Sequence, residues 1–174
     1  MKYLFVFLLM AFPVAGNWNV DPASAKVNFS VKGPFGTVHG SFTGLKAEIN
    51  FNEKDPVGGS IHASIDVKTV KTGTAKRDKD LCNEEVWFNA AKFPQITFSS
   101  KKIAKTAGGY SASGDLTIKG VSKPAVIPFT FTPGDAGGVF KGQFTVKRED
   151  FSLGKSGGMV GEEVTVMLEV PVKK

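Results

Sequence analysis

Apolar and polar residues alternate along most of this chain, and this pattern limits the possible folds more than any other feature. Between Lys26 and Lys32, the apolar residues Val27, Phe29 and Val31 are separated by single polar residues. The same period of two returns at residues 45–51, 61–67, 96–100, 110–118, 125–131, 140–146 and 164–172. Side chains of a strand point alternately to its two faces, so this period is typical of strands with one buried face. The pattern predicts an all-β protein of about eight strands.

Glycine pairs stand between many of these segments, at Gly58-Gly59, Gly108-Gly109, Gly137-Gly138 and Gly157-Gly158. Hairpin turns often need positive φ, which glycine adopts without steric cost, so the pairs predict an antiparallel meander. Between Val38 and Ile49 the apolar phase slips by one residue, and a bulge at Thr43-Gly44 would absorb the slip.

The alternation stops between Thr72 and Phe93, where charged and apolar residues follow a helical spacing. We expect one or two short helices there, at about residues 74–90. Strands that close on themselves leave no unpaired edge. We therefore predict an eight-stranded antiparallel barrel with this short helical excursion, formed as one domain by residues 17–174.

Residues 1–16 have the features of a cleavable export signal. Lys2 is followed by an apolar run from Tyr3 to Phe12 and by small residues up to Gly16. The run is shorter than the about 20 apolar residues that span a bilayer. We expect cleavage after Gly16 and a protein outside the cytoplasm that does not span a membrane. The formal net charge is +6, but the lysines are dispersed, which disfavours nucleic-acid binding.

Few residues of this chain are suited to catalysis or metal binding. It has one cysteine, Cys82, and two histidines, His39 and His62, which lie far apart and on the polar phase of their segments. Ser156 lies in a Gly-Lys-Ser-Gly-Gly segment without the context of a nucleophile elbow or a phosphate loop. We predict no catalytic residue, no metal site and no cofactor.

The predicted interior combines large phenylalanines with the small residues Gly40, Ala47, Ala63, Ala112, Gly114 and Gly142. Such a mixture either interlocks into a filled core or leaves a tunnel for an apolar chain. A tunnel would be lined by Phe29, Phe42, Ile65, Phe98, Leu116, Phe129, Phe144 and Val166.

Several motifs resemble those of the YceI-like family, with matching order and spacing from residue 18 to the end. They are Trp18–Pro22, Gly40–Phe42, Arg77-Asp78, Lys92–Ser100 and Gly114–Pro124. The resemblance implies a lipocalin-like barrel whose tunnel binds a polyisoprenoid, or another long-chain amphiphile such as a fatty amide. It also implies a periplasmic location and no catalysis. Family members commonly have histidines where this chain has Ser24 and near Gly33. If those histidines contact the head group of a ligand in relatives, this protein must treat that group differently.

The helical excursion contains further candidates. Lys76, Arg77 and Lys79 are suited to an anionic head group at the mouth of the barrel, although Arg77-Asp78 also fits a structural ion pair or a helix cap. The aromatic residues Trp87, Phe88 and Phe93 fit a plug, fixed or able to gate the barrel. Cys82 fits either a small buried side chain or a disulfide that joins two chains as a homodimer.

The sequence therefore predicts a protein that binds, and transports or stores, an isoprenoid or another long-chain lipid. One alternative is a barrel with a filled core that acts as a stress or interaction protein. Another is an integral outer-membrane barrel, which the small number of Trp and Tyr residues disfavours because two aromatic girdles would need more. A lipid hydrolase or isomerase is disfavoured because no convergent acid–base set is apparent.

Overall fold

Strands make up most of residues 17–174, the part of the chain that the computed structural model describes. The strands are β1 (Asn17–Val20), β2 (Lys26–Gly33), β3 (Gly36–Phe42), β4 (Lys46–Asn50), β5 (Ser60–Asp66), β6 (Gln95–Thr106), β7 (Gly109–Ile118), β8 (Val121–Gly134), β9 (Gly137–Lys147) and β10 (Glu163–Lys173). The helices are α1 (Ala75–Asn83) and the short 3-10 helices η1 (Val67–Thr69) and η2 (Arg148–Phe151). The expected export signal lies outside the described residues.

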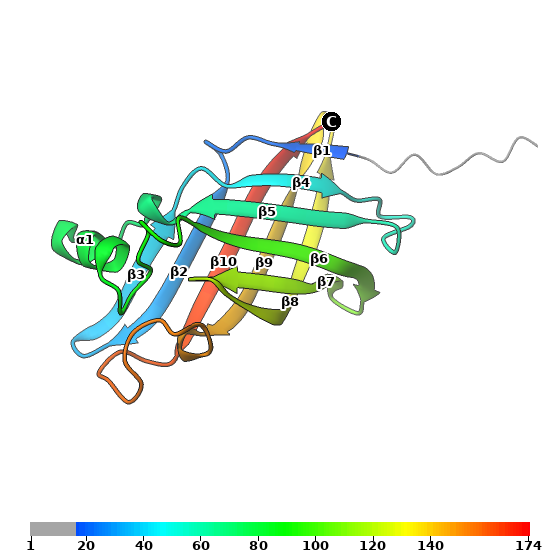
Figure 1. Ribbon diagram of the computed structural model, residues 1–174. Helices are drawn as coiled ribbons and strands as arrows, with labels where there is room; N and C mark the ends of the chain where they lie inside the picture. The colour runs from blue at the N-terminus through cyan, green and yellow to red at the C-terminus, as the bar shows by residue number, and fades with distance from the viewer. Residues whose placement is uncertain (1–16) are drawn as a thin grey trace, which may run out of the picture.

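The strands close into an antiparallel barrel (Figure 1). From β4 to β10 each strand pairs with the next one along the chain, and β1 pairs with both β4 and β10. β2 pairs with another part of the same edge of β10, so β1 and β2 together take the place of one strand in the barrel wall, which we call one wall position. β3 and β4 likewise share one wall position, because β4 pairs with β1 and β3 pairs with β2. The predicted eight-stranded barrel is therefore confirmed, with two of its eight wall positions broken into two strands.

Breaks in the strands have local causes. The slip predicted at Thr43-Gly44 coincides with the interruption between β3 and β4, where Gly44 has a φ of +73°. A second irregularity, between Ser100 and Lys102 of β6, coincides with a change of the apolar phase from Phe98 to Ile103 that the sequence-based prediction missed. The glycine pairs were only partly predictive: Gly137-Gly138 begins β9, because Asp135 and Ala136 form the turn.

One end of the barrel is closed by packed aromatic rings, which we call the aromatic plug: Trp18, Phe51, Tyr110, Phe129, Phe131 and Phe140. Phe51 is central, because it is only 1% exposed and its ring centroid lies 4.9–5.6 Å from those of four neighbours. Trp18 joins β1 to this end by donating its indole Nε1–H to the carbonyl oxygen of Phe51 at 2.9 Å.

At the opposite end, which we call the mouth, the wall is completed by the excursion between β5 and β6 (Figure 1). β3 departs from the line of β4 and is joined to this excursion by the bridge between Ser41 and Lys71. Val67 and Val70, which precede the bridge residue Lys71 in the chain, are each only 1% exposed. The predicted helical excursion is confirmed as the single helix α1 followed by turns up to Lys92. None of the helices within residues 17–174 is long and apolar enough to cross a membrane.

Candidate functional site

The barrel contains an apolar cavity of about 190 Å³ between the aromatic plug and the mouth. All eight residues that were predicted to line a tunnel lie on its wall: Phe29, Phe42, Ile65, Phe98, Leu116, Phe129, Phe144 and Val166. Further aliphatic residues on the inward phase complete the wall, among them Ile49, Ile61, Ile96, Ile127, Leu168 and Val170. These aliphatic residues are inward-facing by the same alternation. That any residue of the wall contacts a ligand remains a prediction.

Small side chains create the space. Ala47 of β4 and Ala63 of β5 are directly paired and both line the cavity, as do Ala112 and Gly142. Two of the predicted small residues do not provide cavity space. The ring of Phe29 lies against Gly40, and a Cβ on Gly114 would collide with the backbone of Ser99 at the irregularity in β6. Gly40 therefore makes room for an aromatic ring, and Gly114 makes room for the neighbouring strand.

The wall offers almost no polar partner to a ligand. Lys141 lies at the wall, but its ammonium group is on the outside of the barrel, 3.4 Å from Glu169 Oε2. An isolated charged group buried in such a cavity would lose its hydration without compensation. An apolar chain gains free energy there, because its surface is removed from water. The geometry therefore favours a hydrocarbon tail.

The segment of residues 72–93, which we call the lid, packs against the mouth end of the barrel through Leu81, Cys82 and Phe88. Phe88 packs over the interior, with its ring 5.9 Å from that of Phe42 in an edge-on arrangement. The other two proposed plug residues pack elsewhere, Trp87 next to Gly154 and Phe93 next to Gly120. Cys82 is half-buried, its thiol donates to the carbonyl oxygen of Val67 at 3.7 Å, and burial raises its pKa. This placement favours packing over a disulfide between chains.

Asp78 holds the start of α1 to the preceding segment. Its Oδ1 accepts hydrogen bonds from the backbone N–H and the hydroxyl of Thr72, both at 2.7 Å. These bonds, together with the nearby charges of Lys71 and Arg77, lower the pKa of Asp78. The carboxylate therefore has a structural role, as the alternative interpretation of Arg77-Asp78 predicted, although its main partner is Thr72.

The three proposed head-group residues are exposed on α1 and do not line the cavity. Lys76 pairs with Asp80 of the same helix at 2.7 Å, and Arg77 and Lys79 face solvent. Ser24 and Gly33, where relatives commonly have histidine, lie in a turn and at a hairpin end, also away from the cavity wall. A head-group role for the cations requires a ligand that extends out of the mouth, and it remains a prediction.

Asp78→Asn should loosen the lid. Because its folded-state pKa is lowered, Asp78 stabilises the fold at pH values above its unfolded pKa, and this contribution is lost as the pH falls below about 4. The protection factors of the α1 amides, which are exchange rates corrected for the intrinsic rate at each pH, should therefore fall at acidic pH in the unmodified protein, and at neutral pH in the variant. Asp80→Asn removes only an exposed pair within the helix and serves as the control. Equal exchange in the two variants would contradict the role of Asp78.

Arg148 organises the loop of residues 152–162, and sequence analysis did not identify it. Its side chain is 3% exposed, and its guanidinium group pairs with Glu149 at 3.1 Å. It donates to four backbone carbonyl oxygens at 2.7–3.2 Å, those of Leu153, Lys155, Val160 and Gly161. The alternation contains no signal for this role, because the acceptors come from an irregular loop.

Arg148→Met should free these carbonyl groups and open the loop. We expect a loss of about 2–3 kcal/mol of unfolding free energy, because several charge-assisted hydrogen bonds disappear together. Trypsin should then cleave faster after Lys155, which lies in this loop. The rate of this cleavage measures how far the loop has opened. Lys147→Met, an exposed change on β9, should leave cleavage unchanged. Unchanged cleavage in the Arg148 variant would contradict its organising role.

Comparisons with known proteins agree with this architecture. The model of the YceI-like domain matches residues 18–172. A UPF0312 protein of Yersinia enterocolitica is 32% identical over 166 residues, which cover 90% of this chain and 86% of that protein. BcnA of Burkholderia cenocepacia has a similar structure, with a TM-score of 0.83, 30% identity, and coverage of 90% of this chain and 100% of that one.

Two more distant structures share the fold. A YceI protein of Campylobacter jejuni has a TM-score of 0.71 and 26% identity, with 79% of this chain and 85% of that one covered. A polyisoprenoid-binding domain of Saccharophagus degradans has a TM-score of 0.69 and 16% identity, with 90% and 97% covered. The family match spans nearly all of the described residues, and the chain therefore belongs to the YceI-like family.

Proposed function

We propose that this protein binds the hydrocarbon chain of a long-chain amphiphile, a polyisoprenoid or a fatty acid or amide, inside the barrel. The observation that carries the proposal is the cavity with its apolar wall. A filled-core interaction protein, the alternative from sequence, would have interlocking side chains in that space. The domain from Saccharophagus degradans is described as polyisoprenoid-binding, but its 16% identity supports only the shared fold.

The size of the cavity bears on how such a chain is held. Pockets for drug-sized ligands usually measure roughly 300–1,000 Å³, whereas this cavity measures about 190 Å³. A long chain therefore needs more room than the cavity provides. Phe88 is a half-buried residue of the lid that packs against the interior, so its displacement would lengthen the cavity toward the mouth. We expect the tail to end near the aromatic plug and the polar end to lie at the mouth.

Binding would serve transport or storage of the lipid, without a chemical step. The exposed His62 ring hydrogen-bonds to Ser99 Oγ at 2.9 Å on the outside of the barrel, and His39 is also exposed. Neither histidine lines the cavity. The apolar wall would hold a tail without an acid or base beside it.

Native mass spectrometry of the protein purified from its own host tests the proposal. We expect a bound lipid that is released on denaturation, and uptake of added polyprenyl or fatty-amide ligands by the emptied protein. A protein that carries no lipid and takes up neither class would overturn the proposal. Hydrolysis or modification of a bound ligand during incubation would overturn its non-catalytic part.

We also propose that the protein acts in the periplasm after removal of residues 1–16. The apolar run from Tyr3 to Phe12 and the small residues after it support export. N-terminal sequencing of the protein from a periplasmic fraction should begin at Asn17. An intact N-terminus in a cytosolic fraction would contradict this location.

A further inference from the structure

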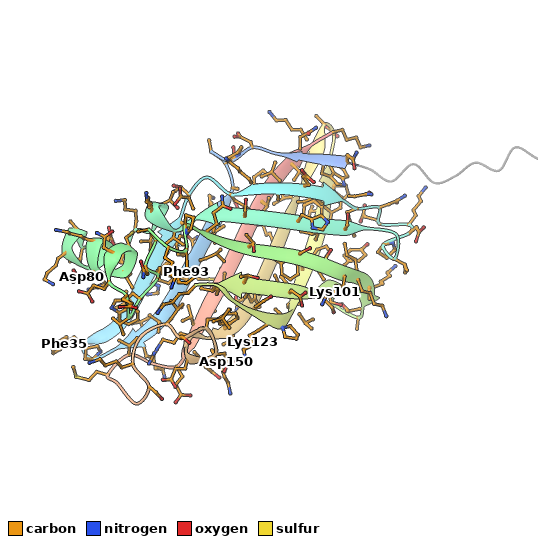
Figure 2. The ribbon with its side chains drawn as sticks, viewed as in Figure 1. Phe35, Asp80, Phe93, Lys101, Lys123 and Asp150 are labelled. Atoms are coloured by element: carbon orange, nitrogen blue, oxygen red, sulfur yellow. The ribbon has the colours of Figure 1, made fainter. Side chains whose placement is uncertain are left out.

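Two large apolar side chains project from the mouth end into solvent. Phe35, at the tip of the β2–β3 hairpin, is 101% exposed, and Met159, in the loop of residues 152–162, is 79% exposed. Figure 2 shows Phe35 at the extremity of the hairpin, at the same end of the barrel as Asp80 of α1. The other large hydrophobic residues exposed among the described ones are Val57, in the β4–β5 turn at the plug end, and Val126, on the side of the barrel in β8.

The two tips belong to neighbouring, well-anchored segments. The N–H of Gly161 donates to the carbonyl oxygen of Lys32 at 2.8 Å, which joins the loop to the hairpin. The N–H of Gly154 donates to the carbonyl oxygen of Val86 at 2.7 Å, which joins the same loop to the lid. The hydrogen bonds of Arg148 hold the loop between these two points. The hairpin tip, the loop and the lid therefore form one continuous rim.

The two segments that carry the tips are positively charged, whereas the exposed Glu162 and Glu163 lie where the loop ends and β10 begins. The segments Val31–Thr37 and Gly154–Gly161 each contain one lysine, Lys32 and Lys155, and no acidic residue. Both lysines are exposed. The nearby carboxylate of Glu149 already has partners: it pairs with the guanidinium group of Arg148 and accepts a hydrogen bond from the hydroxyl of Ser156 at 2.8 Å. Apolar tips flanked by cations match the chemistry of an anionic lipid surface.

We propose that the mouth end docks on an anionic lipid bilayer, with Phe35 and Met159 inserted and Lys32 and Lys155 at the lipid phosphates. The inference rests on the proposed function, because a carrier of a membrane lipid must exchange its ligand with a bilayer. Docking in this orientation places the lid against the membrane surface. Two separate tips offer far less than the about 800 Å² per partner of a standard protein interface, which favours a bilayer over a protein partner or a second copy.

Flotation with vesicles tests the proposal. Vesicles of phosphatidylethanolamine and phosphatidylglycerol should bind the protein at low salt more strongly than vesicles of phosphatidylcholine alone. The double variant F35S/M159S should bind the anionic vesicles about tenfold more weakly. The matched control V57S/V126S removes the same number of exposed apolar side chains elsewhere and should bind like the unmodified protein. K32Q/K155Q should bind anionic vesicles more weakly, and its binding should depend less on salt.

The docking proposal would be overturned by the absence of vesicle binding by the unmodified protein, or by an equal loss of binding in the control pair. Conversion of a dimer to a monomer by F35S/M159S, measured by light scattering, would also overturn it, because the tips would then meet a second copy. Uptake of a fatty amide from solution by F35S/M159S should match that of the unmodified protein. Failure of uptake in the unmodified protein, with vesicle binding intact, would overturn the proposed function and the lipid-exchange role of docking.

Discussion

Replacing Phe51 with alanine should lower the free energy of unfolding by about 3–5 kcal/mol, the largest loss expected of any single change in this protein. Phe51 is 1% exposed and lies among Tyr110, Phe129, Phe131 and Phe140. Its removal would leave a cavity whose rigid aromatic walls come from different strands and cannot collapse together. The edge-on contacts with these rings would be lost as well.

Denaturant unfolding followed by tryptophan fluorescence measures this loss, because Trp18 packs against the same cluster. Phe35→Ala removes the same side chain from a fully exposed position and should change stability by less than about 0.5 kcal/mol. If the free energy of unfolding of the Phe51 variant falls by less than about 1 kcal/mol, the aromatic plug contributes little to the stability of the barrel.

Ala63→Leu should weaken uptake of a long-chain ligand roughly fiftyfold and leave the fold intact. The added carbons would occupy space in the cavity beside Ala47 and displace about three methylene groups of a tail, each worth about 0.8 kcal/mol. Filling existing space costs the fold less than about 1 kcal/mol. The variant therefore separates ligand binding from stability.

Native mass spectrometry with a fatty-amide series measures the uptake, and circular dichroism monitors the fold. His62→Leu adds a leucine at the adjacent outward position of β5 and should leave uptake unchanged. Equal uptake by the two variants would show that the tail does not occupy this part of the cavity. Gly114→Leu is unsuitable for this purpose, because its side chain would collide with Ser99 and disrupt β6.

The cavity wall was predictable residue by residue, and the rim was not. Side-chain direction along a strand follows a strictly local period, so alternation placed Phe29, Phe98 and Val166 inward without knowledge of the strand partners. Gly114 is also on the inward phase, but the backbone of a neighbouring strand occupies the space beside it. Such a contact depends on the register between two paired strands, which cannot be deduced from the sequence of one strand alone.

The closure of the barrel was also hard to predict from the sequence. β1 has four residues, too few to display a period, yet it joins β4 to β10.

The positions of charged side chains were not predictable either. Arg148 belongs to a charged stretch that is typical of an exposed surface, but in the folded chain it is buried among the carbonyl groups of an irregular loop. Lys76, Arg77 and Lys79 are exposed on α1 at the mouth end, away from the cavity wall, and their head-group role stays a prediction.

The sequence by itself therefore determined an all-β fold of about eight strands, its helical excursion and the apolar character of its interior, because each follows from short-range periodicity and composition. The tertiary structure decided that the interior retains a cavity, that the aromatic plug closes one end, and that Phe35 and Met159 share the other. These features depend on which side chains of distant strands meet across the barrel. Packing between distant segments sets those distances, and no local pattern records them.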